Sequence, residues 1–171
     1  MSALLRRGGL VLLLLATPAL AQNQVPPPKP LEALVKATLM TLNDANLTGD
    51  YRVFHARLSG PFRQQYTPER LKQSFREFHD KNVDIDIVCA LAPVWEQPPF
   101  VDPEGKLVLR GIFPTEPTRV SFEMDFLAWD GEWKLIRINV RVAPSADGPP
   151  VPEPPAEPAR KPPTSAKGKK A

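Results

Sequence analysis

The 171-residue chain has few of the residues that stabilise small exported domains or bind metals. It contains a single cysteine, Cys89, so no disulfide can form within the chain and the fold must depend on its apolar core. Its two histidines, His55 and His79, are far apart, and no His or Glu cluster at ligand spacing is visible. Asp84 and Asp86 alone do not complete such a set, so the sequence predicts neither a metal site nor a cofactor.

A basic face is also missing, although the formal net charge of the whole chain is +3. Residues 22–143 contain 15 Lys and Arg against 16 Asp and Glu, which gives this region a net charge of −1. The basic excess lies in the terminal segments. Because nucleic-acid-binding domains gather positive charge on one face, we expect no nucleic-acid partner.

No apolar run reaches the length of about 20 residues that a membrane span needs. Residues 1–21 instead resemble a secretory signal peptide: Arg6 and Arg7 precede a short apolar centre, and Ala19-Leu20-Ala21 forms a small-x-small cleavage pattern. We expect cleavage after Ala21, secretion into what is most simply a bacterial periplasm, and no stable membrane span afterwards. An uncleaved signal anchor is the alternative.

The rest of the chain divides by composition. Residues 22–30 are a proline-rich spacer, and residues 31–143 carry the apolar patterns of one folded domain. Residues 144–171 have proline at nine of 28 positions and no aromatic residue, so we expect a disordered tail rich in proline and lysine. A further interpretation makes the protein a cell-envelope spacer in which this tail is the working part.

The first part of the domain shows helical periodicity. An apolar stripe runs from Leu31 to Ala45, and Gly49 can end that helix in a left-handed conformation. Asp50 can cap a second helix that ends at Ser59-Gly60-Pro61, and Thr67 with Pro68 can begin a third. From Val83 the pattern alternates, which predicts a strand over residues 83–91 with Cys89 as a small buried residue.

The strongest local signal is a hairpin over residues 119–142. Two alternating runs flank Asp130-Gly131, a pair typical of tight hairpin turns. A two-residue turn would set the apolar face of one strand against the polar face of the other, which a buried face does not tolerate. We therefore predict a three-residue loop, Trp129 to Gly131. The resulting pairs are Phe122 with Ile138, Met124 with Ile136, and Glu123 with Arg137 on the solvent side.

Three helices followed by four strands, with W-x-G-x-W-K-L at Trp129 to Leu135, resemble the layout of the nuclear transport factor 2-like (cystatin-like α+β) superfamily. The resemblance covers about two thirds of the chain. It implies three N-terminal helices packed on a curved, mainly antiparallel four-stranded sheet that forms a cone with a pocket at its open end. The superfamily includes isomerases, dehydratases, hydrolases, transport factors and secreted proteins without known activity, so the fold does not determine the function.

Enzymes of this resemblance place acids, tyrosine or histidine on the inward face of the sheet. The expected inward residues of the hairpin offer none: they are Val120, Phe122, Met124, Phe126, Ile136, Ile138 and Val140. The sequence thus favours a secreted, non-enzymatic domain that binds a small apolar ligand or a protein partner. The ligand-binding candidates are Tyr51, His55 and Trp95. The alternative is a small-substrate isomerase- or lyase-like enzyme that uses Tyr51 or His55 as its base.

A partner surface is predicted where four apolar residues gather near the hairpin turn, on a face that is otherwise polar. A second copy of the chain, giving a homodimer, is one form that such a partner takes. The alternative is that the helices or the loop over residues 92–102 cover this patch. The four residues are Leu127, Trp129, Trp133 and Leu135.

Overall fold

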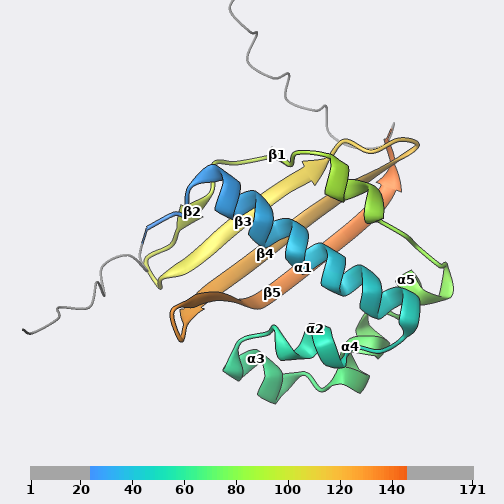
Figure 1. The fold of residues 1–171 in the computed structure, drawn as a ribbon, viewed down its shortest axis with the longest axis horizontal. Coiled ribbons are helices and arrows are strands. Elements are labelled where there is room, and N and C mark those ends of the chain that lie inside the picture. Colours follow the sequence, from blue (N-terminus) through green and yellow to red (C-terminus); the bar gives the residue numbers. More distant parts are fainter. Residues whose placement is uncertain (1–23, 146–171) are drawn as a thin grey trace, which may run out of the picture.

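The computed structural model describes residues 24–145, which form five α-helices, one 3-10 helix and five strands (Figure 1). In chain order these are α1 (Pro28–Thr48), α2 (Arg52–Ala56), α3 (Gly60–Gln65), α4 (Pro68–Ser74), α5 (Arg76–Asp80), η2 (Asp86–Ala90), β1 (Val94–Trp95), β2 (Phe100–Val101), β3 (Lys106–Phe113), β4 (Thr118–Trp129) and β5 (Glu132–Pro144). The expected α+β class is confirmed, with more helices and one more strand than predicted. The predicted signal peptide over residues 1–21 lies outside the described residues. So does the predicted tail over residues 144–171, apart from Pro144, which ends β5, and Ser145.

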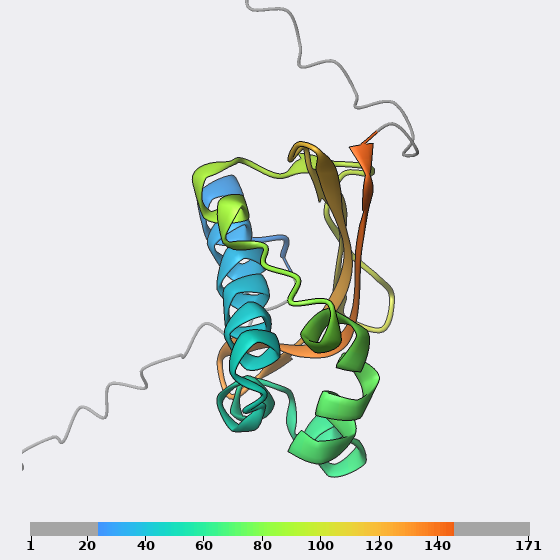
Figure 2. The same cartoon turned by 90° about the vertical axis from the view of Figure 1, so that its right-hand side faces the viewer.

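The sheet is antiparallel, with strand order β1-β3-β4-β5, and β2 also pairs with β3. Helix α1 crosses one face of this sheet, and α2, α3 and α4 lie beside the β5 edge (Figure 1). The edge-on view shows two layers, with α1 on one side and the twisted sheet on the other (Figure 2). Among residues 24–145, no helix is both long and apolar enough to cross a membrane.

The core lies between α1 and the sheet. The predicted stripe of α1 is buried at Leu31, Val35, Thr38, Leu42 and Ala45, because these positions recur at helical spacing. Leu34 of that stripe is half-buried, and Leu39, which was not predicted, is buried beside it. The inward face of the sheet is confirmed at most of its predicted positions, and Ile136 and Ile138 are half-buried. The buried residues of that face are Leu107, Leu109, Phe113, Val120, Phe122, Met124, Phe126, Leu135 and Val140.

The helix ends follow the predicted signals at Gly49 and Thr67, but the N-cap of α2 is Tyr51 rather than the predicted Asp50, and it has no side-chain cap. Gly49 is left-handed, with φ of 71°, and its N–H donates to Ala45 O. The side chain of Thr67 accepts the Arg70 N–H at the start of α4. Ser59 also differs: we expected the second helix to end there, but its Oγ accepts the Phe62 N–H and begins α3.

The predicted register of the hairpin is wrong. Trp129 pairs directly with Glu132, so the turn has two residues, and both have positive φ (51° at Asp130 and 80° at Gly131). These dihedrals are those of a type I′ turn, whose twist matches that of the strands. The parity mismatch is resolved by a β-bulge further along the strands: Asp125 pairs with Arg137, Phe126 pairs with Leu135, and Ile136 is the extra residue. Consequently the observed pairs are Phe122 with Val140, Met124 with Ile138, and Glu123 with Asn139.

The turn geometry can be tested at Asp130. Asp130→Ala should lower the free energy of unfolding by about 1 kcal/mol, because alanine tolerates a left-handed conformation less well than aspartate. Asp130→Asn should leave it unchanged. Urea unfolding of the two variants measures the difference. Equal stability of wild type and Asp130→Ala would mean that residue 130 is not left-handed. That result would favour the three-residue loop, in which only Gly131 is left-handed.

The predicted strand over residues 83–91 is also wrong. The chain there is irregular and then forms η2, with only Ile85 and Val88 buried. The hydrogen bond that a neighbouring strand would make to Ile85 comes instead from the buried Asn43 of α1, whose Oδ1 accepts the Ile85 N–H at 3.1 Å. Cys89, expected to be buried, is exposed, and Val88 is the buried residue of η2.

Candidate ligand-binding pocket

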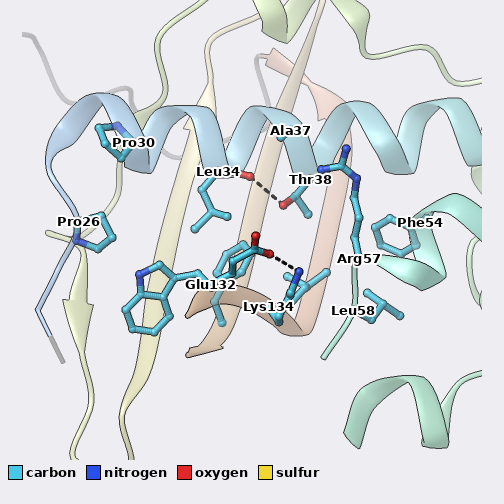
Figure 3. A pocket seen from close by; sticks show the side chains of 13 residues that line it. Pro26, Pro30, Leu34, Ala37, Thr38, Phe54, Arg57, Leu58, Glu132 and Lys134 are labelled. Atoms are coloured by element: carbon cyan, nitrogen blue, oxygen red, sulfur yellow. Dashed lines mark hydrogen bonds and ion pairs between the residues drawn. The ribbon is translucent and has the colours of Figure 1, made fainter. Parts of the chain in front are cut away.

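A pocket of about 360 Å³ opens between the first half of α1, the segment around α2, and the start of β5 (Figure 3). Its volume lies near the lower end of the roughly 300–1,000 Å³ typical of ligand sites. Most of the side chains around it are apolar, and four carry polar groups. The lining residues are Pro26, Pro30, Leu34, Ala37, Thr38, Phe54, Arg57, Leu58, Phe126, Glu132, Trp133, Lys134 and Leu135.

Helix α1 supplies one wall. Leu34 and Thr38 are four residues apart, so they lie one above the other on the same helix face. The Thr38 hydroxyl donates to Leu34 O at 2.8 Å, which uses its proton within the helix. The wall is therefore largely apolar, although it contains a threonine.

The strand segments between the hairpin turn and the β-bulge form the opposite wall. There, Leu135 pairs with Phe126 and both face the core, while Trp133 pairs with Ala128. The two-residue turn sets this pairing, and the bulge then returns Ile138 and Val140 to the same core face.

The floor comes from α2 and the residues after it. Phe54 and Leu58 are buried, and Leu58 forms an isolated parallel bridge with Leu135. The next residue, Ser59, donates its N–H to Leu135 O at 2.9 Å. These backbone contacts fix α2 against the edge of β5 and so set the width of the pocket.

Three charged side chains line the pocket. Glu132 and Lys134 form an ion pair, and this pair lowers the pKa of Glu132, chiefly through the hydrogen bond from Lys134. Arg57 is exposed, and within residues 24–145 its side chain makes no hydrogen bond or ion pair. Figure 3 shows the Arg57 side chain extending toward α1, apart from Pro26 and Pro30 at the other end of the pocket.

The predicted ligand residue Tyr51 lies elsewhere. It is 2% exposed and borders a separate hollow with Gly49 and Lys72. Its hydroxyl donates to Asn46 Oδ1, and burial raises the pKa of Tyr51 to about 12. At neutral pH it therefore carries its proton and has the role of a buried hydrogen-bond donor.

His55 and Trp95 do not join Tyr51 in one site. The Nε2 atom of His55 lies 3.3 Å from Arg63 O, on the half-buried side of α2. Trp95 is on β1, where its ring packs edge-on against Phe122 with centroids 5.9 Å apart. None of the three predicted residues lines the pocket beneath α1.

The four residues of the predicted partner surface are distributed over different parts of the domain. Leu135 is in the core and Trp133 lines the pocket. Leu127 is half-buried, and Trp129 is exposed with its indole against Gly60, where an added Cβ would lie 3.4 Å from Cζ2. The two-residue turn separates them, because it pairs odd-numbered residues of β4 with even-numbered residues of β5.

A charged cluster occupies the solvent side of the sheet. Arg110 Nη2 lies 2.7 Å from Asp125 Oδ1, and Arg137 Nη2 lies 3.2 Å from Glu123 Oε2. Asn139 donates to Glu123 Oε1 at 3.3 Å. Positive and negative charges balance in this cluster, which suits a structural network on a sheet face. In the part of the chain that the structure describes, no group of three His, Cys, Asp or Glu could hold a metal ion.

The pocket residues that sequence reasoning missed are mainly Arg57, Glu132 and Lys134. Nothing local distinguishes them from other solvated charges, and only the packing of α2 beside β5 brings them to one opening. Leu34 was predicted on the helix stripe, and Trp133 and Leu135 were singled out for a different role. No protein-family model, no curated protein and no solved structure matches the chain.

Proposed function

We propose that this chain is a secreted, non-enzymatic binding domain that holds a small apolar ligand in the pocket between α1 and β5. The observation that carries the proposal is the lining itself. Leu34, Phe126 and Leu135, with the prolines before and at the start of α1, offer an apolar surface within a cavity of about 360 Å³. Concave, largely apolar cavities with a few polar groups are the usual form of small-molecule sites.

The enzyme alternative has less support. It assigns the base to Tyr51 or His55, and neither residue lines this pocket. The Tyr51 hydroxyl, moreover, is buried and hydrogen-bonded to Asn46.

We further propose that the domain has a nuclear transport factor 2-like cone and reaches the cell envelope by cleavage after Ala21. Two features support the cone: the helices precede the strands in the chain, and α1 lies across one face of an antiparallel sheet. The small-x-small pattern of Ala19 and Ala21 supports the export.

The site can be tested by filling it. Ala37→Phe places a ring at the pocket wall, whereas Ala33, one turn earlier on α1 and also exposed, does not line the pocket. We expect the neutral dye N-phenyl-1-naphthylamine to bind residues 22–171 with a rise in fluorescence. Ala37→Phe should weaken binding at least about tenfold, equal to about 1.4 kcal/mol, and Ala33→Phe should leave it unchanged.

Two results would contradict this proposal. If the wild-type domain does not enhance the dye fluorescence, the pocket does not bind small apolar molecules. If Ala33→Phe and Ala37→Phe behave alike, the dye binds somewhere else. Far-ultraviolet circular dichroism of both variants provides the check on folding.

A further inference from the structure

The charges around the pocket do not cancel. Arg57 and Lys134 carry positive charge, and Glu132 carries the single negative charge of the lining, so the lining has a net charge of +1. Over residues 22–143 as a whole the balance is −1. The pocket is thus locally positive on a domain that is slightly negative.

Arg57 is the cation with unused bonding capacity. Its guanidinium has five N–H donors in a planar fork that matches a carboxylate or phosphate group. Within residues 24–145, no acceptor takes any of these donors. An exposed arginine without a partner is common, but this one borders an apolar cavity.

The ion pair of Lys134 is easily exchanged. The side chain of Glu132 is 68% exposed, whereas that of Lys134 is 28% exposed, so the acid is the solvated member and the ammonium is the sheltered one. Exposed pairs of this kind contribute only about 0.2–1 kcal/mol. An anionic group in the pocket can therefore replace Glu132 beside Lys134 at small cost.

Charged and apolar groups are also separated along the pocket. Pro26 and Pro30 lie at one end in Figure 3, and Arg57 lies at the other, with Leu34 between them. A ligand that fits both ends has an apolar body and one polar head. The charged part of the pocket has two cations, Arg57 and Lys134, and one acid, Glu132, which a ligand can displace. The polar head that fits this part is therefore negative.

We infer that the ligand is an apolar anion, namely a small amphiphile with one carboxylate-like head and a single apolar chain or ring system. The head lies between Arg57 and Lys134, and the apolar body packs against Leu34, Phe126 and the two prolines. This inference rests on the proposed function, because it names the chemical class of ligand for the same pocket.

The test compares three probes that share a ten-carbon chain and differ in the head: decanoate, decanol and decyltrimethylammonium. Each is titrated against residues 22–171, below its micelle-forming concentration, and displacement of N-phenyl-1-naphthylamine is measured. We expect decanoate to bind about three- to tenfold more tightly than decanol, and the cation to bind most weakly. The preference for decanoate should shrink as salt is added, because screening weakens exposed charge interactions.

Two variants should change the affinity for decanoate in opposite directions. Arg57→Gln should weaken the binding of decanoate by about three- to tenfold and leave the binding of decanol unchanged. Glu132→Gln should strengthen the binding of decanoate, because it removes the acid that competes with the ligand for Lys134. The matched controls are Arg63→Gln, an exposed arginine outside the pocket, and Glu104→Gln, which removes the acid of the similarly spaced Glu104–Lys106 pair.

The outcomes separate the two proposals. If decanol and decanoate bind equally and Ala37→Phe weakens both, the inference of an anionic ligand is wrong while the apolar pocket stands. If the control variants change decanoate binding as much as Arg57→Gln does, the general charge of the domain is responsible and the inference is again wrong. If neither the dye nor any of the three probes binds, the proposed function and the inference fall together.

Discussion

Phe122→Ala is expected to lower the free energy of unfolding by about 3–5 kcal/mol, the usual range for a truncated core aromatic. Phe122 is 1% exposed and its ring packs against Phe113, with centroids 5.6 Å apart, and against Trp95. The ring also covers Gly111 of β3, where an added Cβ would lie 2.8 Å from its Cζ atom. Because no side chain of Gly111 can expand into the space, the truncation leaves a cavity.

The matched control is the next residue on β4. Glu123 points to the solvent side, where its side chain is 34% exposed and contacts Arg137 and Asn139. Glu123→Ala should cost under about 1 kcal/mol, as is usual for partly solvated ion pairs. Urea unfolding of both variants measures the difference. Equal costs would mean that the two faces of β4 are wrongly assigned.

The faces of the sheet could be predicted because burial imposes a period of two on a strand. Val120, Phe122, Met124 and Phe126 alternate with polar residues, and all four are buried. Their partners on β5 could not be predicted. The sequence shows that the parity of the two strands must change once, but a longer loop and a bulge meet that need equally well.

The turn explains why the bulge is the observed solution. Asp130 and Gly131 both adopt positive φ, which aspartate tolerates and glycine favours, so the pair closes a two-residue turn. The extra residue is then placed at Ile136, next to Leu135. The two-residue turn thus sets Leu135 opposite Phe126 on the core side beneath the pocket, and the bulge returns Ile138 and Val140 to that side.

Over residues 83–91, in contrast, the alternating pattern predicted a strand that does not form. Val83, Ile85 and Ile87 alternate as a strand would, but Ile87 is exposed and the segment forms no ladder. Its backbone bonds instead to the side chain of Asn43, about 40 positions earlier in the chain. Alternation over so few residues does not distinguish a strand from an irregular segment held by side chains.

The candidate site was the least predictable part. Tyr51 and His55 were singled out because their side chains can do chemistry. The Tyr51 hydroxyl, however, is buried against the Asn46 side chain, and His55 Nε2 lies against Arg63 O. The pocket instead draws residues from α1, the α2 segment and β5, which lie far apart in sequence. Arg57 gives no local signal, because a surface arginine beside a pocket and one in open solvent have the same sequence context.

The second large effect is expected at Asn43. Its side chain is 1% exposed and makes three hydrogen bonds to one loop: Nδ2 donates to Asp84 Oδ1 at 2.9 Å and to Asp86 Oδ1 at 2.8 Å, and Oδ1 accepts the Ile85 N–H. Asn43→Ala removes all three and leaves the buried Ile85 N–H without a partner. One buried unsatisfied group costs about 1–3 kcal/mol, and hydrogen bonds to charged groups contribute about 1.5–3 kcal/mol each. Because Asp84 and Asp86 are exposed and regain water, we expect a total loss of about 2–4 kcal/mol.

Two further variants separate the hydrogen bonds of Asn43 from a general effect on α1. Asn43→Asp keeps an oxygen for the Ile85 N–H but sets a third carboxylate against Asp84 and Asp86, so it should be at least as destabilising at neutral pH and recover as the pH falls. Asp44→Ala changes the exposed neighbour on the same helix and should cost under about 0.5 kcal/mol, as surface substitutions usually do. Amide hydrogen exchange gives the local reading, since the Ile85 amide should lose protection in Asn43→Ala and keep it in Asp44→Ala. If Asn43→Ala and Asp44→Ala have equal stability and equal exchange at Ile85, then Asn43 does not hold this loop, and the account of why residues 83–91 form no strand is wrong.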